Sequence, residues 1–476
     1  MNRYNKVILI AERRHMMTPI EQFYKMVRGK RVGVIGIGVS NRPLIHMLAA
    51  AGAQVTARDK NPVPDPEEWE RLGIKVLTGP DYLAGLDDEL IFKTPGMRFD
   101  IPELVKAREN GSTVTSEMEV FFDLCPTAHT IAITGSDGKT TTTTLTAKIL
   151  EAAGYKVWLG GNIGTPLLSK IGEIGPDDWV VLELSSFQLM TMRQSPHIAV
   201  MTNITPNHLD VHKDYQEYID AKRNIYLYQK PEDTLILNRG NDVTASFAPE
   251  GKGTVLDFSY DGTTADGIEL DNGVLTLVHA GEKTPLFPAD EILLPGRHNV
   301  ENYMAAILAT APFVKPEDIE HVATTFQGVE HRLQLIRELD GVRYYNSSID
   351  SSPNRTKAAL SVFKQKLILI AGGKDKGIPY DDLAAPLLEH VKTLILTGLT
   401  GPKIEKALLD ECARRGIENP ITIYHFDEYP ELVEAARRIA EPGDIVLLSP
   451  ASTSFDKFKN FMERGDTFAR LVRELK

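Results

Sequence analysis

Cysteine and long apolar runs are what this sequence lacks most. Its 476 residues include two cysteines, Cys125 and Cys412, which lie far apart and form no CxxC pair. That excludes a disulfide framework and a cysteine-based zinc site, and it indicates a reducing compartment. No stretch approaches the roughly 18 apolar residues of a membrane span. We therefore expect a cytoplasmic protein with no membrane attachment.

Positive charge is also scarce. The chain has 53 Lys and Arg against 65 Asp and Glu, a formal net charge of −12. This balance argues against a nucleic-acid surface, so phosphate groups must be bound by local devices. The content of 42% apolar and 25% charged residues is ordinary for a globular protein. The chain is too long for one core and suggests about three domains.

The segment Thr134–Thr140 is the most informative motif in the chain. It reads Thr-Gly-Ser-Asp-Gly-Lys-Thr, follows the apolar run 130–133 and opens a helix-compatible stretch at Lys139. Glycines let backbone N–H groups approach phosphate oxygens, a helix N-terminus adds a positive field, and a lysine adds a full charge. The hydroxyl of Thr140 is suited to Mg²⁺. Position 133 holds Ile133 instead of the first glycine of the usual P-loop, so we interpret the motif as a shorter phosphate loop.

Apolar strand-like runs alternate with helix-compatible segments along the chain, which is typical of parallel α/β sheets. We predict an α/β protein of three domains. These are a Rossmann-like N-terminal domain, a central P-loop-type ATPase domain with a parallel sheet plus a small β-sheet, and a Rossmann-like C-terminal domain. The predicted spans are 29–120, 121–326 and 327–476. Residues 1–28 are interpreted as an N-terminal extension, in which Met16 and Met17 are alternative starts.

The first block begins with a buried strand that enters a glycine turn, residues 31–38, and a second strand is predicted at Gln54–Asp59. The dinucleotide fingerprint needs a third glycine at position 41, where this chain has Asn41, so an NAD site is disfavoured. Asp59 stands at the position where an acid would accept a hydrogen bond from a ribose hydroxyl. From spacing alone, a solvated aspartate at a strand end is an equally good interpretation. A further strand, 89–96, ends in a turn of the kind found at the ligand edge of an open sheet.

In the central block, polar residues follow apolar strands. Glu183 ends the run from Trp179, and a carboxylate at a strand tip near a phosphate loop is a plausible Mg²⁺ ligand or a solvated residue. His208 follows another strand, and taken alone it is more typical of a structural histidine. Lys222 lies on a helical stretch after it. A β-rich region at 254–290, with a hairpin turn at 271–273, predicts a small sheet.

The third block contains four more strand-like runs, at 342–345, 366–370, 393–396 and 444–448. Two polar loops follow such strands, Gly372-Gly-Lys-Asp-Lys376 and Ser449-Pro-Ala-Ser-Thr-Ser454. Loops at these strand ends are the expected lining of a ligand crevice. Taken alone, Lys374 and Lys376 could also form a solvated basic turn with no ligand.

Taken in order, the motifs of residues 30 to 476 resemble the Mur ligases. A set of ordered motifs is far more specific than any one of them. The motifs are 134–140, 161–164, 183–189, His208 with Ala221-Lys222, Gly296-Arg-His-Asn299 with Asn302, Glu330-His-Arg332, 372–377, and 448–451 through Phe461.

The resemblance implies roles for individual residues. Catalytic roles fall to Lys139, Glu183, His208 and Lys222. ATP contacts fall to Gly135, Ser136, Asp137, Gly138, Lys139, Thr140, Thr141, Asn299, Asn302 and Arg332, with His331 beside the nucleotide. Nucleotide-sugar contacts fall to Val39, Ser40, Asp59, Thr94, Asn162 and His208. Metal contacts fall to Thr140, Glu183, His208 and, as a carbamylated lysine, Lys222. Contacts to D-glutamate fall to Lys376, Ser454 and Phe461.

The implied activity is an ATP-dependent ligase that adds D-glutamate to UDP-N-acetylmuramoyl-L-alanine through an acyl phosphate. ADP and phosphate are its other products, and two Mg²⁺ ions assist. Such an enzyme serves cytoplasmic peptidoglycan precursor synthesis and is expected to be a monomer. A ligase of the same fold with another acceptor, such as L-glutamate, is the nearest alternative. A folate polyglutamate ligase, a non-catalytic nucleotide-sugar sensor and an NAD-dependent oxidoreductase are weaker ones.

Three positions depart from the pattern of the family. Asp137 stands where an asparagine is usual. In the segment 346–352, where the narrower family has Asn-Asp-Ser-Lys-Ala-Thr-Asn, Ser347 replaces an acid and Ile349 replaces a phosphate-facing lysine. Either Asp350 or Arg355 is a candidate to compensate.

Overall fold

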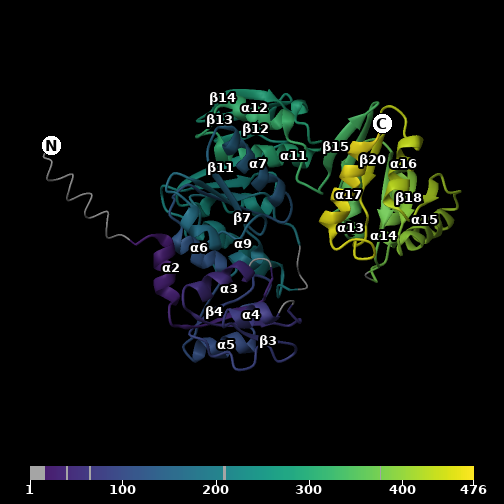
Figure 1. Cartoon of the computed structure of the whole chain (residues 1–476). Coiled ribbons are helices and arrows are strands. Elements are labelled where there is room, and N and C mark those ends of the chain that lie inside the picture. Colours follow the sequence, from purple (N-terminus) through teal and green to yellow (C-terminus); the bar gives the residue numbers. More distant parts are fainter. Residues whose placement is uncertain (1–16, 39–40, 64–65, 207–210, 376) are drawn as a thin grey trace. The chain divides into compact units, whose positions relative to one another are not determined.

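The computed structural model describes residues 17–38, 41–63, 66–206, 211–375 and 377–476. Figure 1 labels the elements along the chain. The chain divides into two compact units. One comprises Met1–Ala289 with Val300–Val322, and the other comprises Asp290–Asn299 with Ala323–Lys476. The first unit contains two β-sheets and the second contains one.

The first sheet has five parallel strands in the order β3-β2-β1-β4-β5. The strand β1 is central, and four of its five residues are buried. Polar side chains therefore gather beyond the strand ends. The strands are β1 (Arg31–Ile35), β2 (Gln54–Asp59), β3 (Lys75–Thr78), β4 (Leu90–Phe92) and β5 (Thr113–Thr115). The helices are α3 (Asn41–Ala50), α4 (Pro66–Arg71) and α5 (Pro102–Glu109).

Part of the segment predicted as an extension is folded. The helix α2 (Pro19–Val27) begins with a capping box, in which Thr18 and Glu21 satisfy each other's backbone N–H groups. Its apolar face inserts Phe23 and Val27, both fully buried, into the core of the first unit. It contacts the helix α6 (Glu117–Leu124). Residues 17–28 are thus part of the packed structure, and residues 1–16 lie outside the described part.

The central sheet has nine strands in the order β14-β13-β12-β11-β10-β9-β6-β8-β7. Strands β6 and β8 are buried along their whole length, as expected for parallel strands covered on both faces. The predicted small β-sheet is present as a hairpin region, and it continues the central sheet through β11 next to β10. The strands are β6 (Thr130–Thr134), β7 (Val157–Gly161), β8 (Trp179–Glu183), β9 (Ile198–Met201), β10 (Thr234–Asn238), β11 (Thr254–Ser259), β12 (Gly267–Asp271), β13 (Val274–His279) and β14 (Glu282–Pro288).

Helices connect and cover the strands of this sheet. The helix α7 begins directly after the phosphate loop, and six threonines from position 140 onward line its first turns. Several of these hydroxyls bond back to carbonyls one turn earlier, which satisfies them inside the fold. The helices are α7 (Lys139–Ala152), η1 (Leu168–Glu173), α8 (Ser186–Leu189), α9 (Tyr215–Leu227), α10 (Asp242–Ala245), η2 (Ala248–Glu250), η3 (Ala289–Glu291), α11 (Arg297–Thr310) and α12 (Pro316–Thr325).

The second unit is built on a six-stranded sheet in the order β15-β16-β20-β17-β18-β19. Only the β15 and β16 pair is antiparallel. The core lies on both faces of β17 and β20. The strands are β15 (Gln334–Leu339), β16 (Val342–Asn346), β17 (Leu367–Gly372), β18 (Val391–Thr397), β19 (Thr422–His425) and β20 (Ile445–Leu448). The helices are α13 (Pro353–Leu360), α14 (Asp381–His390), α15 (Gly401–Arg415), α16 (Tyr429–Ile439) and α17 (Phe461–Glu474).

The fold class agrees with the prediction of parallel α/β sheets. Among the described residues, no helix is long and apolar enough to cross a membrane.

Candidate active site

The phosphate loop joins β6 to α7, and steric constraints explain why it contains glycine at positions 135 and 138. Gly138 precedes the first residue of α7 and has a φ of +78°, a left-handed conformation. A Cβ at this position would collide with the side-chain oxygen of Asn302. At Gly135 a Cβ would collide with the hydroxyl of Thr202. The loop therefore keeps glycine where its backbone meets neighbouring polar groups, and its N–H groups stay close to the helix N-terminus.

Residues after β9 hold the loop backbone in place. The side chain of Asn203 accepts a hydrogen bond from the Asp137 N–H at 2.9 Å, and the hydroxyl of Thr202 donates to the Asp137 carbonyl at 2.6 Å. The Ser136 and Tyr218 hydroxyls lie 2.9 Å apart. These contacts fix the loop from one side. The Asp137 side chain itself is exposed.

Two lysines converge on one carbonyl of the loop. The Nζ of Lys139 donates to the carbonyl oxygens of Gly135 and Ser136 at 3.0 and 2.9 Å. The Nζ of Lys222, from α9, donates to the same Gly135 oxygen at 2.7 Å and to the Thr134 hydroxyl at 3.2 Å. The sequence separates these lysines by more than eighty residues, and the fold brings them to one atom.

Lys222 is 1% exposed, and its ammonium lies 4.8 Å from the centre of the Tyr218 ring. Burial and then the charge of Lys139 lower the pKa of Lys222 well below its usual value, while Glu183 and Asp137 act in the opposite direction. The neutral amine is therefore favoured far more than on a surface lysine. A neutral amine is a nucleophile, whereas an ammonium ion is not.

Glu183 lies at the end of β8 and links three segments. Its carboxylate accepts a hydrogen bond from the Thr140 hydroxyl at 2.7 Å and one from the Asn162 side-chain amide at 2.7 Å. The Asn162 backbone N–H also bonds to the Glu183 carbonyl at 2.8 Å. Three residues predicted separately from motifs thus form one connected group at the carboxyl edge of the central sheet.

This group suits a hard divalent cation. Mg²⁺ prefers carboxylate, hydroxyl and phosphate oxygens, and it commonly takes only one or two carboxylates from the protein. Glu183 and Thr140 supply such oxygens beside the phosphate loop. In the described ranges, no three His, Cys, Asp or Glu side chains cluster as a metal site. A protein-only metal cage is therefore not formed there, and His208 lies outside the described residues.

The two asparagines of α11 take different positions. Asn302 is buried, and its side-chain oxygen accepts a hydrogen bond from the Thr142 hydroxyl at 3.2 Å, next to Gly138. Asn299 belongs to the second unit, where its amide donates to the Pro295 carbonyl at 2.7 Å. Asn302 is thus placed against the phosphate loop.

In the first sheet, the predicted nucleotide contacts meet at the ends of β1, β2 and β4. One oxygen of Asp59 accepts the Ile37 N–H, and the other accepts the Asn61 N–H, both at 2.8 Å. Thr94 lies against Gly36, where a Cβ would crowd it. Asp59 therefore stabilises the glycine turn beside Thr94. The predicted contacts Val39 and Ser40 fall outside the described residues.

In the second unit, two predicted loops pair with each other. Lys374 and Thr453 form an isolated antiparallel bridge, with the Lys374 N–H 2.9 Å from the Thr453 carbonyl. The next residue, Ser454, is buried, and Phe461 opens α17. The loops after β17 and β20 are thus joined, as expected for strand ends at one sheet edge. The predicted contact Lys376 falls outside the described residues.

Two of the three residues that depart from the family pattern, Ser347 and Ile349, lie next to a buried acid in the second unit. Asp350 is 6% exposed, accepts a hydrogen bond from the Ser449 hydroxyl at 2.8 Å and is hydrogen-bonded to the side chain of Ser347. Burial raises the pKa of Asp350, and those two hydrogen bonds and the nearby Arg332 and Arg355 oppose this rise. Asp350 therefore places a carboxyl group beside the position where the family has an acid.

The neighbouring motif 330–332 is also held in the second unit. His331 is buried, lies 3.2 Å from the Asn346 amide and meets the Phe461 ring edge to face, with 5.9 Å between ring centres. The hydroxyl of Ser348 donates to the Phe461 carbonyl at 2.7 Å. His331, predicted to lie beside the nucleotide, therefore contacts Phe461, which is predicted to contact D-glutamate.

The sequence patterns did not reveal two residues that shape this site, Thr202 and Tyr218. Neither belongs to a motif with a chemical signature. Thr202 and Tyr218 contact the loop across 65 and 82 residues of sequence, respectively. Only their position just after β9 and on α9 offered a signal.

Comparison with known protein families matches two parts of the chain. Residues 133–310 match the Mur ligase middle domain, and residues 331–452 match the Mur ligase glutamate ligase domain. The chain belongs to the Mur ligase family. Members of this family are ATP-dependent ligases.

Individual relatives match along nearly the whole chain. The UDP-N-acetylmuramoylalanine--D-glutamate ligase of Ruminiclostridium cellulolyticum is 54% identical over 466 residues, which is 97% of this chain and 100% of that protein. The protein of the same name from Acetivibrio thermocellus is 52% identical, with the same coverage. The crystal structure of UDP-N-acetylmuramate-alanine ligase from Thermotoga maritima has a TM-score of 0.56 at 18% identity. That match covers 94% of this chain and 100% of that one, and it supports the fold.

Proposed function

We propose that this protein joins D-glutamate to UDP-N-acetylmuramoyl-L-alanine in an ATP-dependent amide-forming reaction. The identity of 54% across the full length of a relative with that name is the observation that carries the proposal. The group formed by Thr140, Glu183 and Asn162 beside the phosphate loop supports the ATP half of the reaction.

The proposal assigns ATP to the loop 134–140 and to Asn302. The loop N–H groups and Lys139 bind the phosphates, and Lys139 offsets the charge repulsion between two anions that must approach each other. Lys139 is the first residue of α7, and its hydrogen bonds to the loop carbonyls already place its ammonium group at the loop where the phosphates would bind. The adenosine end is assigned to the second unit, with Arg332 and Asn299.

Mg²⁺ would be held by Glu183 and Thr140, and by Lys222 once this lysine is carbamylated. Bound there, it would neutralise developing charge on the transferred phosphoryl group. Burial and the charge of Lys139 lower the pKa of Lys222, which favours the neutral amine that a reaction with CO₂ requires. The neutral nitrogen attacks the carbon of CO₂ and loses a proton to solvent, so that the amine becomes a carbamate, which carries a carboxylate-like negative charge. A second ion at this position is part of the proposal.

The chemical steps follow from the poor reactivity of a carboxylate as an acyl donor. An oxygen of the L-alanine carboxylate attacks the γ-phosphorus, and the bond to ADP breaks, which gives an acyl phosphate. The D-glutamate nitrogen then attacks the carbonyl carbon. The resulting tetrahedral species expels phosphate, and the nitrogen loses a proton. Because water would hydrolyse the acyl phosphate, the chain must exclude it during turnover.

The division of labour among the three sheets is also proposed. The first sheet, within 29–120, binds the uridine diphosphate through Asp59, Thr94 and the glycine turn. The central sheet, within 121–326, binds ATP and the reacting carboxylate, with Asn162 facing the sugar peptide. The third sheet, within 327–476, binds D-glutamate through Ser454, Phe461 and Lys376. We propose that the enzyme acts as a cytoplasmic monomer in peptidoglycan precursor synthesis.

The test is phosphate release from ATP in the presence of UDP-N-acetylmuramoyl-L-alanine, with D-glutamate, L-glutamate or no amino acid. We expect release with D-glutamate alone. Release with L-glutamate instead would assign the protein to a ligase of the same fold with another acceptor. If no phosphate is released in any of the three reactions and the protein still binds the nucleotide sugar tightly, the protein is a non-catalytic sensor.

A further inference from the structure

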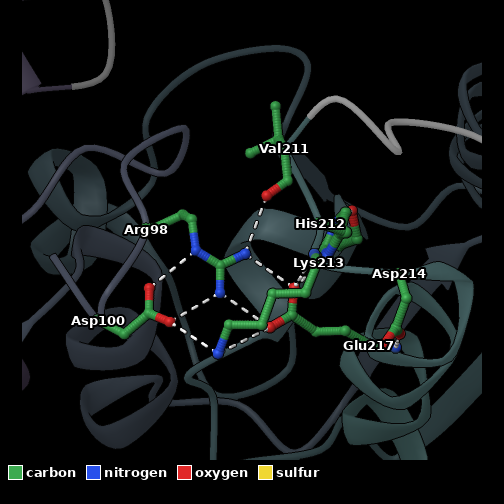
Figure 2. Close-up of polar contacts among 8 residues, drawn as sticks. Arg98, Asp100, Val211, His212, Lys213, Asp214 and Glu217 are labelled. Atoms are coloured by element: carbon green, nitrogen blue, oxygen red, sulfur yellow. Dashed lines mark hydrogen bonds and ion pairs between the residues drawn. The ribbon is translucent and has the colours of Figure 1, made fainter.

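Arg98 forms a dense set of polar contacts between the first sheet and the central sheet (Figure 2). Its Nε and Nη2 donate to the two oxygens of Asp100, and its Nη1 and Nη2 donate to the two oxygens of Glu217, all at 2.8 Å. Its Nη1 also donates to the Val211 carbonyl at 2.9 Å. A guanidinium group has five N–H donors, and all five have an acceptor here.

The acceptors fix the start of α9. Glu217 lies in the first turn of this helix, where its backbone N–H bonds to the capping side chain of Asp214 at 2.8 Å. Its carboxylate also accepts the backbone N–H of Lys213 at 2.8 Å. Lys213 extends its own ammonium to Asp100 at 3.1 Å. Arg98, Asp100, Lys213 and Glu217, which we call the Arg98 clamp, thus bind the helix N-terminus to another part of the fold.

The same helix carries Lys222, five residues after Glu217. A second connection runs through His212, which is stacked on Phe187 with 5.3 Å between ring centres and lies 3.0 Å from the Ser186 hydroxyl. Ser186 and Phe187 belong to α8, which begins three residues after Glu183. The start of α9 is therefore tied to the strand end that carries the proposed metal ligand.

The other half of the clamp, Arg98 and Asp100, comes from a loop that follows a strand of the first sheet. This loop lies between β4 and α5 and also contains Thr94. Thr94 is a proposed contact of the uridine diphosphate. Three residues lie between Thr94 and Arg98, so the loop that faces the nucleotide sugar and the helix that carries Lys222 share one guanidinium group.

The charges of the clamp are arranged to keep it closed. Hydrogen bonds from Arg98 lower the pKa of Glu217 to about 2 and hold the pKa of Asp100 below its usual range. The side chains of Arg98, Asp100 and Glu217 are only 19%, 27% and 22% exposed. A bidentate arginine is a stiff connector, because its planar donors fix both distance and orientation.

We propose that Arg98 is a positioning residue for the ligation reaction, because it sets the distance between the nucleotide-sugar loop and the helix that presents Lys222. The inference rests on the proposed function for its link to catalysis. A misplacement of about 1 Å in an active site costs roughly a hundredfold in rate. Arg98 itself contacts no substrate, since its donors are occupied within the protein.

The experiment compares four variants of the full-length enzyme. Arg98→Met removes the guanidinium and keeps the apolar bulk, and Arg98→Lys keeps the charge but not the forked donors. Arg98→Met with Glu217→Gln relieves the carboxylate repulsion left in the single variant. Arg223→Ala is the matched control, since it removes an arginine–glutamate pair, to Glu250 at 2.7 Å, from the same helix without touching the first sheet.

For each variant, kcat, KM for ATP, Tm and amide hydrogen exchange of α9 are measured. We expect Arg98→Met to lower kcat about tenfold or more, to change KM for ATP less than about threefold, and to speed exchange in the first turn of α9. Arg98→Lys recovers part of kcat. The double variant regains Tm but not kcat, and Arg223→Ala lowers Tm with kcat within about threefold of the parent.

Two results would overturn the inference. If kcat returns together with Tm in the double variant, Arg98 only stabilises the fold. If exchange in α9 is unchanged in Arg98→Met, the clamp does not hold the helix. An inactive parent enzyme would count against the proposed function, and the exchange measurement would still decide whether Arg98 fixes α9.

Discussion

Lys139 and Lys222 donate hydrogen bonds to the same acceptor, the carbonyl oxygen of Gly135, at 3.0 and 2.7 Å. Two ammonium groups so close repel each other, and the buried one gives up its charge more readily. Burial and this repulsion lower the pKa of Lys222 well below its usual value. The arrangement supports the proposed carbamylation of Lys222 and the proposed role of Lys139 as a phosphate ligand.

Lys222→Ala is expected to lower kcat at least about a hundredfold, because it removes the carboxylate that carbamylation would create. Added formate or acetate should restore part of the activity by occupying the space of the missing carbamate. Lys148→Ala is the control, since Lys148 is an exposed lysine on α7 that pairs with Glu151. Full activity of Lys222→Ala without added carboxylate would refute the role of Lys222.

Glu183→Gln tests the group at the end of β8. The variant keeps the shape of the side chain but removes its charge, so the donors of Thr140 and Asn162 both lose a charged acceptor, and one of the two carboxylate oxygens becomes an amide nitrogen that cannot accept. We expect kcat to fall about a hundredfold or more and the Mg²⁺ concentration for half-maximal activity to rise. The free energy of unfolding should fall by only about 1 kcal/mol. A Mg²⁺ titration of phosphate release checks this, and an unchanged titration curve would show that Glu183 does not serve the metal.

The departures at 346–352 lead to a prediction about where the acid of this loop resides. Asp350 contacts Ser347, which stands where the family has an acid. Asp350→Ala should lower kcat/KM for ATP about tenfold or more, and adding Ser347→Asp to that variant should restore most of it, because the carboxylate returns to the same neighbourhood. Ile349→Lys should keep activity. Steady-state kinetics measure kcat/KM for ATP in each variant. If the variant that combines Asp350→Ala with Ser347→Asp has the same kcat/KM as Asp350→Ala alone, the acid has not been relocated.

The Arg98 clamp predicts a dependence of stability on pH. The folded pKa of Glu217 is about 2, below the ordinary value of 4.5, and that of Asp100 is also lowered. A carboxylate with a lowered folded pKa contributes stability that is present above its unfolded pKa and is lost as the pH falls through the folded one. The difference in urea midpoint between the parent and Arg98→Met should therefore be constant from about pH 8 to 5 and shrink below about pH 4. A difference that grows on acidification would contradict this assignment.

The parts of the fold that the sequence predicted well are those governed by local patterns. The predicted spans of Gln54–Asp59 and Trp179–Glu183 coincide with β2 and β8, because buried apolar runs between turn residues leave little choice. The helix α2 was missed, since its nine residues carry a capping box but only a short apolar face. The hairpin region was predicted as a small sheet, and the pairing of β11 with β10, which joins it to the central sheet, depends on contacts that no local pattern contains.

The candidate site divides in the same way. The phosphate loop is visible in sequence, because glycine and lysine spacing expresses its geometry directly. Glu183 contacts Thr140 and Asn162 because the parallel strands that carry these segments end at one edge of the sheet. The sequence indicated this only through the position of Glu183 at the end of a predicted strand in the same block as the phosphate loop. The shared carbonyl of Gly135 and the contacts of Arg98 are long-range, and single positions in a sequence carry no sign of them.

The most direct test of the account follows the oxygen of the substrate. UDP-N-acetylmuramoyl-L-alanine with both oxygens of the alanine carboxylate labelled as ¹⁸O is ligated to D-glutamate, and the released phosphate is analysed by mass spectrometry. An acyl phosphate transfers one labelled oxygen to phosphate and leaves the other in the amide, so we predict phosphate that carries one ¹⁸O. Unlabelled phosphate would contradict the acyl-phosphate route and, with it, the roles assigned to Lys139, Glu183 and Lys222.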